Sequence, residues 1–296
     1  MTDLRPPSRD PRVEARAHGH GLLASSIVAP AAPRPPAWLL VLHGIYGRGR
    51  NWTSVARALA ARRSDWASAL VDLRLHGASP AFEPPHTVRS AAADLGRFER
   101  ATGFVAGAVA GHSFGGKVAL AHAESGGERL AQVWVLDSTP EVRPPAGSAW
   151  RLLEVVRTLP DRFTSRAEAA GAIERHGYAP TIAAWMASNL THHEGAYRWR
   201  LDLDAMEALL RSFFATDLWT VVESPPPGTS IHFVKAESSG VLSDHACGRI
   251  EDAGRHHGRV HLHRIAGGHW VNVDNPGAVV ELLAAHLPRH GTGPAR

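Results

Sequence analysis

The sequence predicts an α/β fold in which a mostly parallel sheet is flanked by helices and interrupted by a helical insertion. Three observations lead to this prediction. Short apolar runs alternate with helical patterns at the spacing of right-handed βαβ units. Several runs, such as WLLVLHG at 38–44, are apolar almost throughout, as expected of strands buried on both faces. The alternation stops at 141–220, where only helical patterns follow one another.

The expected elements follow one another in a regular order. Strands are expected at 13–17, 22–29, 38–44, 68–73, 104–111, 132–137, 230–237 and 259–267. Helices are expected between or after these strands at 52–62, 87–101, 115–124, 243–256 and 277–288. The insertion is expected to hold helices at 148–158, 165–176, 179–190 and 202–214, and no strand. Trp185 and Met186 belong to an apolar stripe at helical spacing within it.

These elements divide the chain into three parts. Residues 1–12 carry charges and prolines and are expected to form a disordered tail. Residues 13–140 and 221–296 are expected to form an α/β core, and residues 141–220 a helical lid on it. A chain of 296 residues is long enough for two domains, or for one α/β domain with such an insertion.

Composition excludes several classes of protein. Hydrophobic residues make up 44% and charged residues 20%, as in soluble globular proteins. The net charge is only +4 and arginines are scattered among acids, which argues against nucleic-acid binding. Cys247 is the only cysteine, so an intrachain disulfide is impossible. No run of 18 apolar residues and no secretory signal is recognisable, so we expect a cytoplasmic protein without a membrane span.

The pentapeptide GHSFG at 111–115 matches the pattern G-x-S-x-G. It follows an apolar run and precedes a helical pattern, which is where a nucleophile on a tight strand-to-helix turn must lie. Gly111 and Gly115 leave room for the strand and the helix to approach each other. Ser113 is therefore the predicted nucleophile, rather than a simple helix cap.

A serine nucleophile needs a base and an oxyanion site. Among 19 histidines, His269 stands out because GGHW at 267–270 follows the last expected strand, which agrees with the order Ser, acid, His along the chain. The loop LHGIYG at 42–47 supplies backbone N–H groups. We therefore predict that the amides of Ile45 and Phe114 hold the oxyanion. The loop at 72–80 is expected to lie behind the site, with His76 supporting it or contacting the substrate.

The acid partner of the histidine is less apparent from the residues. Asp137 ends the strand QVWVLD, whereas Glu237 and Asp244 follow the strand after the insertion. Ser239 stands near Glu237 in KAESSGVLS and offers a hydroxyl group. Asp137 is favoured as the acid that orients the imidazolium, with Ser239 as a supporting hydrogen-bond partner, and Glu237 and Asp244 are the fallback acids.

Several motifs together resemble one branch of the α/β-hydrolase superfamily. In chain order they are LHGIYGRGRNW, DLRLHGASP, GHSFGGKVAL, VLDSTPE, NL…YRWRLDLDAM and GGHWVNVDNP, spanning about residues 15–288. The branch comprises bacterial esterases and their mitochondrial relatives, which are lidded acyl-ester and acyl-thioester hydrolases. The resemblance implies an acid displaced to the strand after the nucleophile, with a serine at the usual acid position. It therefore implies Asp137 as the acid and Ser239 as its hydrogen-bond partner.

The sequence departs from that pattern at a few positions. Tyr46 stands where Phe is usual, Leu75 where Asn is usual, and Ala236–Glu237 where Gly–Gly is usual. These positions lie near the expected mouth of the site, so they bear on substrate preference more than on the reaction. Tyr46, Trp185 and Met186 are predicted to line the acyl pocket.

The predicted reaction is hydrolysis of a small carboxylic ester or thioester through an acyl-enzyme, with no cofactor. No group of histidines comes with cysteine or carboxylate residues at ligand spacing, so no metal site is expected. Two alternatives use the same residues: a C–C bond hydrolase or cofactor-free perhydrolase, and a ligand-binding receptor built on this fold. Acyl length, leaving group and oligomeric state do not follow from the sequence.

Overall fold

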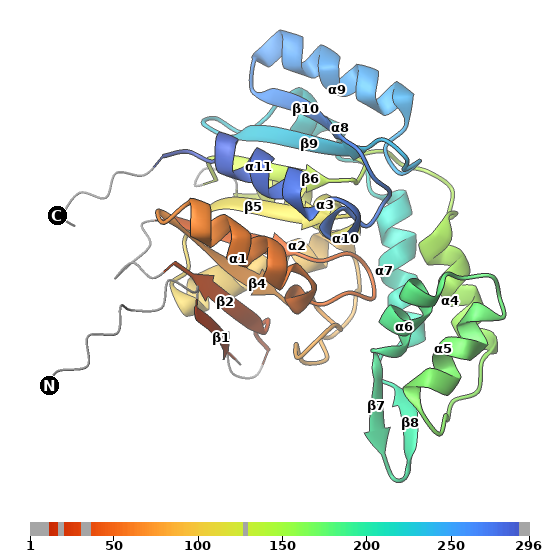
Figure 1. Cartoon of the computed structure of the whole chain (residues 1–296). Coiled ribbons are helices and arrows are strands. Elements are labelled where there is room, and N and C mark those ends of the chain that lie inside the picture. The colour runs from red at the N-terminus through yellow and green to blue at the C-terminus, as the bar shows by residue number, and fades with distance from the viewer. Residues whose placement is uncertain (1–11, 17–20, 31–36, 127–129, 290–296) are drawn as a thin grey trace, which may run out of the picture.

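The computed structural model describes residues 12–16, 21–30, 37–126 and 130–289. An eight-stranded sheet lies at the centre (Figure 1). In spatial order its strands are β1 (Arg12–Arg16), β2 (Ser25–Ala29), β4 (Trp66–Val71), β3 (Ala37–Leu42), β5 (Ala106–His112), β6 (Gln132–Leu136), β9 (Ser230–Ala236) and β10 (Val260–Ile265). The six strands from β4 to β10 are parallel, whereas β1 and β2 pair antiparallel. The fold class predicted from the sequence is confirmed.

Helices cover both faces of this sheet (Figure 1). One face packs against α1 (Thr53–Arg62) and α11 (Pro276–His286). The other face packs against α2 (Val88–Thr102), α3 (Phe114–Gly126) and α9 (Asp244–His257). Strands covered on both sides bury every side chain, as β4 and β6 do, which explains their uninterrupted apolar sequences.

The core elements agree with those expected from the sequence to within a few residues. Two short helices were not expected: a 3₁₀ turn at Gly49–Trp52 before α1, and α10 (Val271–Asp274) after the last strand. The expected tail at 1–12 lies outside the described residues, except that Arg12 already begins β1.

Most of the segment between β6 and β9 forms a separate lobe beside the carboxyl ends of the strands (Figure 1). The helices of this lobe are α4 (Ser148–Thr158), α5 (Arg166–Glu174), α6 (Pro180–Ala187) and α7 (Leu203–Ala215). The last helix of the segment, α8 (Trp219–Glu223), packs against α3 and α9 of the core. The domain boundary expected at residue 220 falls within α8.

The expectation that the segment between β6 and β9 contains no strand is wrong. β7 (Leu190–His193) and β8 (Ala196–Trp199) form an antiparallel hairpin. Glu194 and Gly195 connect them with φ values of 49° and 77°, the left-handed pair that a two-residue hairpin turn requires. Tyr197 and Phe163 exchange two backbone hydrogen bonds, of 2.9 and 2.8 Å, which attach the hairpin to the preceding loop. The expected helix at 179–190 therefore stops at Ala187.

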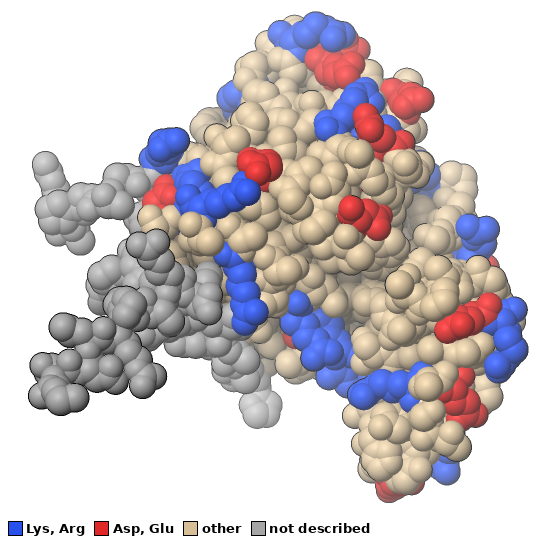
Figure 2. Space-filling model, viewed as in Figure 1, with Lys and Arg blue, Asp and Glu red and all other residues tan. Residues whose placement is uncertain are grey.

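On the face shown in Figure 2, acidic and basic side chains are interspersed and no large area carries one sign. Across the described ranges, no helix has both the length and the apolar character needed to span a bilayer. Parallel strands place their carboxyl ends at one edge of the sheet, and ligand sites of such sheets lie there. Four loops that the sequence analysis singled out leave this edge, after β3, β5, β6 and β10.

Candidate active site

Ser113 occupies the turn between β5 and α3. It has a φ of 52°, a left-handed conformation that is strained for a residue with a Cβ, and its N–H donates to Leu136 O at 3.0 Å. Strand and helix meet so closely there that a Cβ on Gly111 would lie 2.0 Å from Gly115 O. A Cβ on Gly115 would lie 2.6 Å from His43 O. Both glycines are therefore required by the close approach of the backbone.

Substitution of Gly111 by alanine tests this close approach. The added methyl group would displace α3, so we expect Gly111→Ala to lower the free energy of unfolding by about 3 kcal/mol. Gly248→Ala is the matched control, because a Cβ there meets open space within α9. It should stabilise the protein by about 0.5–1 kcal/mol. Urea unfolding of both variants gives the comparison, and equal stabilities would contradict the steric argument.

Ser113 begins a chain of hydrogen bonds that ends on a buried carboxylate. Its Oγ lies 3.1 Å from Nε2 of His269, whose Nδ1 lies 2.7 Å from Oδ2 of Asp137. The same Oδ2 accepts a bond of 2.5 Å from Ser239 Oγ, and Oδ1 accepts one of 3.1 Å from Ala236 N–H. The imidazole therefore carries its proton on Nδ1, toward the carboxylate, and leaves Nε2 to accept the proton of Ser113.

Asp137 is fully buried, yet it is held as an anion. Burial opposes its ionisation, but the hydrogen bonds from His269 and Ser239 outweigh burial and place its pKa below the ordinary value. Glu237 and Asp244, the other acids considered from the sequence, are both exposed. In the described part of the chain neither one contacts His269, so the structure places Asp137 alone on the imidazole.

A second histidine supports the base. His112, the variable residue before Ser113, is buried and donates from Nε2 to His269 O at 2.7 Å. Burial lowers its pKa to about 3, so it is neutral at physiological pH. The two rings lie 4.7 Å apart. The sequence analysis did not single out His112, although its place within G-x-S-x-G is a signal for a contact beside the nucleophile.

The amides predicted to form the oxyanion site face one cavity. Ile45 and Phe114 both line the space that contains Ser113 and His269. Among the residues that the structure describes, no protein group accepts a hydrogen bond from either N–H. The next residue, Tyr46, has a φ of 62°, which turns the loop sharply behind Ile45. Two backbone donors are thus left for a ligand oxygen.

Two neutral histidines hold this loop from behind. His76 accepts the N–H of Tyr46 at 3.0 Å on Nε2, and its Nδ1 donates to Arg74 O at 2.8 Å. His43 Nε2 accepts a hydrogen bond from the N–H of Leu73 at 3.0 Å. Burial lowers the pKa of His43 to about 4 and that of His76 to about 3. His76 is 1% exposed, so it supports the loop and does not reach a substrate.

The insertion is tied directly to the same loop. Arg48 donates from Nη2 to Ser188 O at 2.6 Å and to Asn189 Oδ1 at 3.1 Å. Asn189 in turn donates from Nδ2 to Tyr46 O at 2.9 Å. The loop that carries Ile45 is therefore held by hydrogen bonds to the residues that follow α6.

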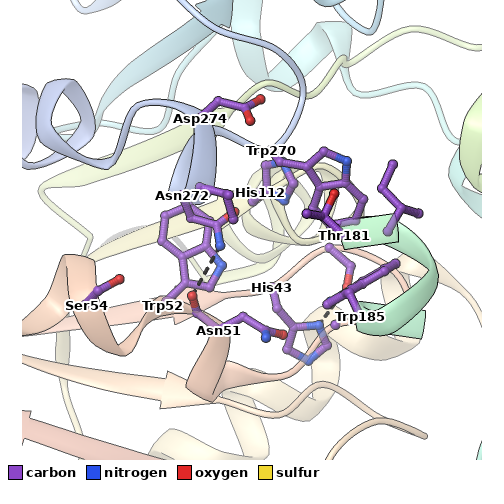
Figure 3. A pocket seen from close by; sticks show the side chains of 14 residues that line it. His43, Asn51, Trp52, Ser54, His112, Thr181, Trp185, Trp270, Asn272 and Asp274 are labelled. Carbon is purple, nitrogen blue, oxygen red and sulfur yellow. Dashed lines mark hydrogen bonds between the residues drawn. The ribbon is translucent and has the colours of Figure 1, made fainter. Parts of the chain in front are cut away.

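Two cavities touch Ser113, and a third shares lining residues with the smaller of them. The larger of the two, the main cavity of about 630 Å³, is lined by Ser113, His269, Ile45, Phe114, side chains of α7 and the loop before α4. A small one of about 30 Å³ also touches Ser113 and His269, and Tyr46 and Trp185 line it. Trp185 and Trp270 meet edge to face at 4.4 Å and line both the small cavity and a third of about 360 Å³. Figure 3 shows this third cavity, with Trp52 on its wall.

The predicted substrate-binding residues differ in where they lie. Tyr46 and Trp185 reach these cavities, but Met186 is fully buried and lines none of the three. Assigning Met186 to the pocket was wrong because neighbouring residues on a helix point about 100° apart, and α6 turns Met186 into the core. The sequence analysis did not predict that Trp270 and residues of α7 line these cavities. The position of Trp270, directly after His269, was a signal that could have identified it.

A metal site is not formed by the histidine-rich strands. Trp134 stacks on His232 at 4.3 Å and on His263 at 5.6 Å, and His261 contacts His232 at 4.5 Å, so the four rings form a cluster. In the ranges described above, no three His, Cys, Asp or Glu side chains are arranged to hold a metal ion. The cluster lies among packed rings, away from Ser113.

Known proteins resemble this chain over most of its length. Residues 39–282 match the model of the alpha/beta hydrolase family. The sn-1-specific diacylglycerol lipase ABHD11 of Xenopus tropicalis is 26% identical over 258 residues, which cover 82% of this chain and 75% of that protein. The lipase LipV of Mycobacterium tuberculosis is 28% identical over 209 residues, covering 69% and 75%.

Solved structures share the fold as well. An esterase from a marine microorganism superposes with a TM-score of 0.77 at 22% identity, covering 90% of this chain and 99% of that one. The Mycobacterium tuberculosis esterase Rv0045c gives a TM-score of 0.67 at 22% identity, covering 93% and 90%. The fold, the strand–turn–helix around Ser113 and the family match agree, and the chain belongs to the alpha/beta hydrolase family.

Proposed function

We propose that this protein is a serine hydrolase that cleaves carboxylic esters or thioesters through an acyl-enzyme. The observation that carries the proposal is the chain Ser113–His269–Asp137 opening on a cavity with two free backbone amides. Relatives named as lipases and esterases support an ester as the substrate. Ser239 is proposed to hold the catalytic carboxylate in place through its short hydrogen bond.

The reaction follows from this geometry. His269 Nε2 removes the proton of Ser113 as Oγ attacks the carbonyl carbon, and Asp137 stabilises the imidazolium that forms. The amides of Ile45 and Phe114 hold the negative charge that develops on the carbonyl oxygen. His269 then protonates the departing alcohol or thiol. Water repeats the cycle on the acyl-enzyme, releasing the acid and restoring Ser113.

Residues 141–220 are proposed to act as a lid over a core formed by residues 13–140 and 221–296. The helices of this segment supply walls to the two cavities at Ser113 and to the third cavity beside them. Closing an active site in this way excludes water and strengthens electrostatic interactions within it. The tie from Arg48 to the end of α6 would couple lid position to the loop that carries Ile45.

The experiment that tests this function is a turnover series with p-nitrophenyl esters of two to sixteen carbons. Steady release of p-nitrophenolate over many turnovers is expected, and the preferred length measures the acyl pocket. A single burst followed by silence would instead favour a receptor that retains its product. Absence of any reaction with these esters and with acyl thioesters would overturn ester hydrolysis and favour a C–C bond substrate.

A further inference from the structure

The main cavity at Ser113 has an unusual distribution of charge. Among its 18 lining residues are two arginines, Arg143 and Arg151, and no aspartate or glutamate. Arg143 is half-buried in the loop before α4, and its N–H donates to Phe214 O at 2.9 Å. Arg151 lies in the first turn of α4 at the rim. A cavity with cations and no acid on its wall attracts negatively charged ligands.

Neither guanidinium is neutralised by the protein around it. Several other arginines of the same lobe are paired, such as Arg157 with Asp204 and Arg211 with Glu207. Within the described ranges no carboxylate lies within ion-pairing distance of Arg143 or Arg151.

The acids nearest in sequence are engaged elsewhere. Glu141 accepts hydrogen bonds from Thr139 and Ser243, and Glu154 accepts one from Trp150 Nε1 at 2.8 Å. The positive charge of Arg143 also acts inside the protein. After burial, it is the strongest influence lowering the pKa of Lys117, to about 7. The wall of the cavity therefore carries two guanidinium groups that no carboxylate of the described residues pairs with directly.

The apolar residues that line the same cavity indicate what kind of chain the ligand carries. Leu210, Phe213 and Phe214 of α7 form an apolar wall of the same cavity. An aliphatic chain attached to the scissile carbonyl would pack on this wall. A charged group at its far end would meet the guanidinium groups, whose planar donors match carboxylate and phosphate oxygens.

We propose that the substrate is an ester or thioester with an anionic group, a carboxylate or a phosphate, at the far end of the part that enters this cavity. Arg143 and Arg151 bind that group and determine specificity. This inference rests on the proposed hydrolase function and adds the class of substrate to it.

The test compares two esters of equal length. Mono-p-nitrophenyl adipate carries a free carboxylate, and methyl p-nitrophenyl adipate is its neutral counterpart. The ratio of their kcat/KM values should favour the anionic ester by about tenfold or more, the size expected of a charge-assisted contact. The ratio should fall as ionic strength rises. It should approach one in the double variant Arg143→Gln, Arg151→Gln.

Arg211→Gln is the matched control. It removes one positive charge from neighbouring α7, and Arg211 does not line the cavity, so the ratio should stay as in the wild type. A wild-type ratio near one overturns the proposal, and so does an equal loss in Arg211→Gln and in the double variant. A p-nitrophenyl ester ending in a phosphonate, run in the same series, separates phosphate from carboxylate recognition.

Failure of the hydrolase function is distinguishable from failure of this inference. If neither ester shows turnover that depends on Ser113, the hydrolase function is refuted and the arginine site is tested by binding alone. Binding affinity is then measured by calorimetric titration of Ser113→Ala with monomethyl adipate and with dimethyl adipate. Tighter binding of the anion, abolished by the two Arg→Gln changes, supports the arginine site, and equal binding refutes it.

Discussion

Replacing Ser113 by alanine should reduce kcat for p-nitrophenyl butyrate by about 10⁴- to 10⁶-fold. The loss follows because no other hydroxyl lies within reach of His269 Nε2 in the described structure, where Ser113 Oγ lies at 3.1 Å. His269→Ala should lower kcat by a similar factor. The double variant should be no worse than either single one, because the two residues act as one unit.

Ser138→Ala is the control for this prediction. Ser138 is fully buried, its Oγ lacks a hydrogen-bond partner among the described residues, and it directly follows Asp137. Loss of that hydroxyl should leave turnover and the free energy of unfolding close to wild type. Turnover that survived in folded Ser113→Ala would show that another residue is the nucleophile.

The exchange of Asp137 for asparagine should lower kcat by about 10⁴-fold, the scale known for a triad aspartate. An amide removes the negative charge that stabilises the imidazolium, and it favours the tautomer with the proton on the wrong nitrogen of His269. Initial rates with the same ester, measured on protein whose folding is verified by circular dichroism, provide the test.

Two neighbouring substitutions separate Asp137 from the rival acid. Ser239→Ala removes one hydrogen bond to Oδ2 of Asp137 and should lower kcat by about tenfold. Glu237→Gln should have little effect, because Glu237 is exposed and its N–H bonds to Ile265 O, away from His269. A crippling loss in Glu237→Gln, with activity kept in Asp137→Asn, would reverse the assignment.

The choice between these acids illustrates what a sequence leaves open. β6 and β9 are neighbours in the sheet, with Leu136 opposite Val234. An acid after either strand therefore ends near the same imidazole, so a linear pattern is compatible with both. The structure selects Asp137, whose N–H bonds to Val234 O at 2.7 Å and whose side chain turns toward His269.

The insertion was the least predictable part of the chain. The turn Glu194–Gly195 is a local signal for the hairpin, but the flanking strands are only four residues long, with β7 mostly exposed and β8 partly buried throughout, so they lack a clear apolar alternation. The side of α6 that faces the cavity was equally unpredictable. Trp185 and Met186 share one apolar stripe, and only packing against the core decides which of them reaches the site.

The sequence by itself determined the order of strands and helices in the core, and the turn that exposes Ser113. It also predicted His269, after the last strand, as the residue beside Ser113. These features depend on local causes: buried strands need apolar runs, and a tight turn needs Gly111 and Gly115. The family resemblance already implied Asp137 as the acid, and the structure places its carboxylate on the imidazole. The tertiary structure alone decided which lid residues reach the cavity, and that Arg143 and Arg151 line it without paired carboxylates. Those features depend on contacts between segments far apart in the chain, and no local pattern of residues records which segments will meet.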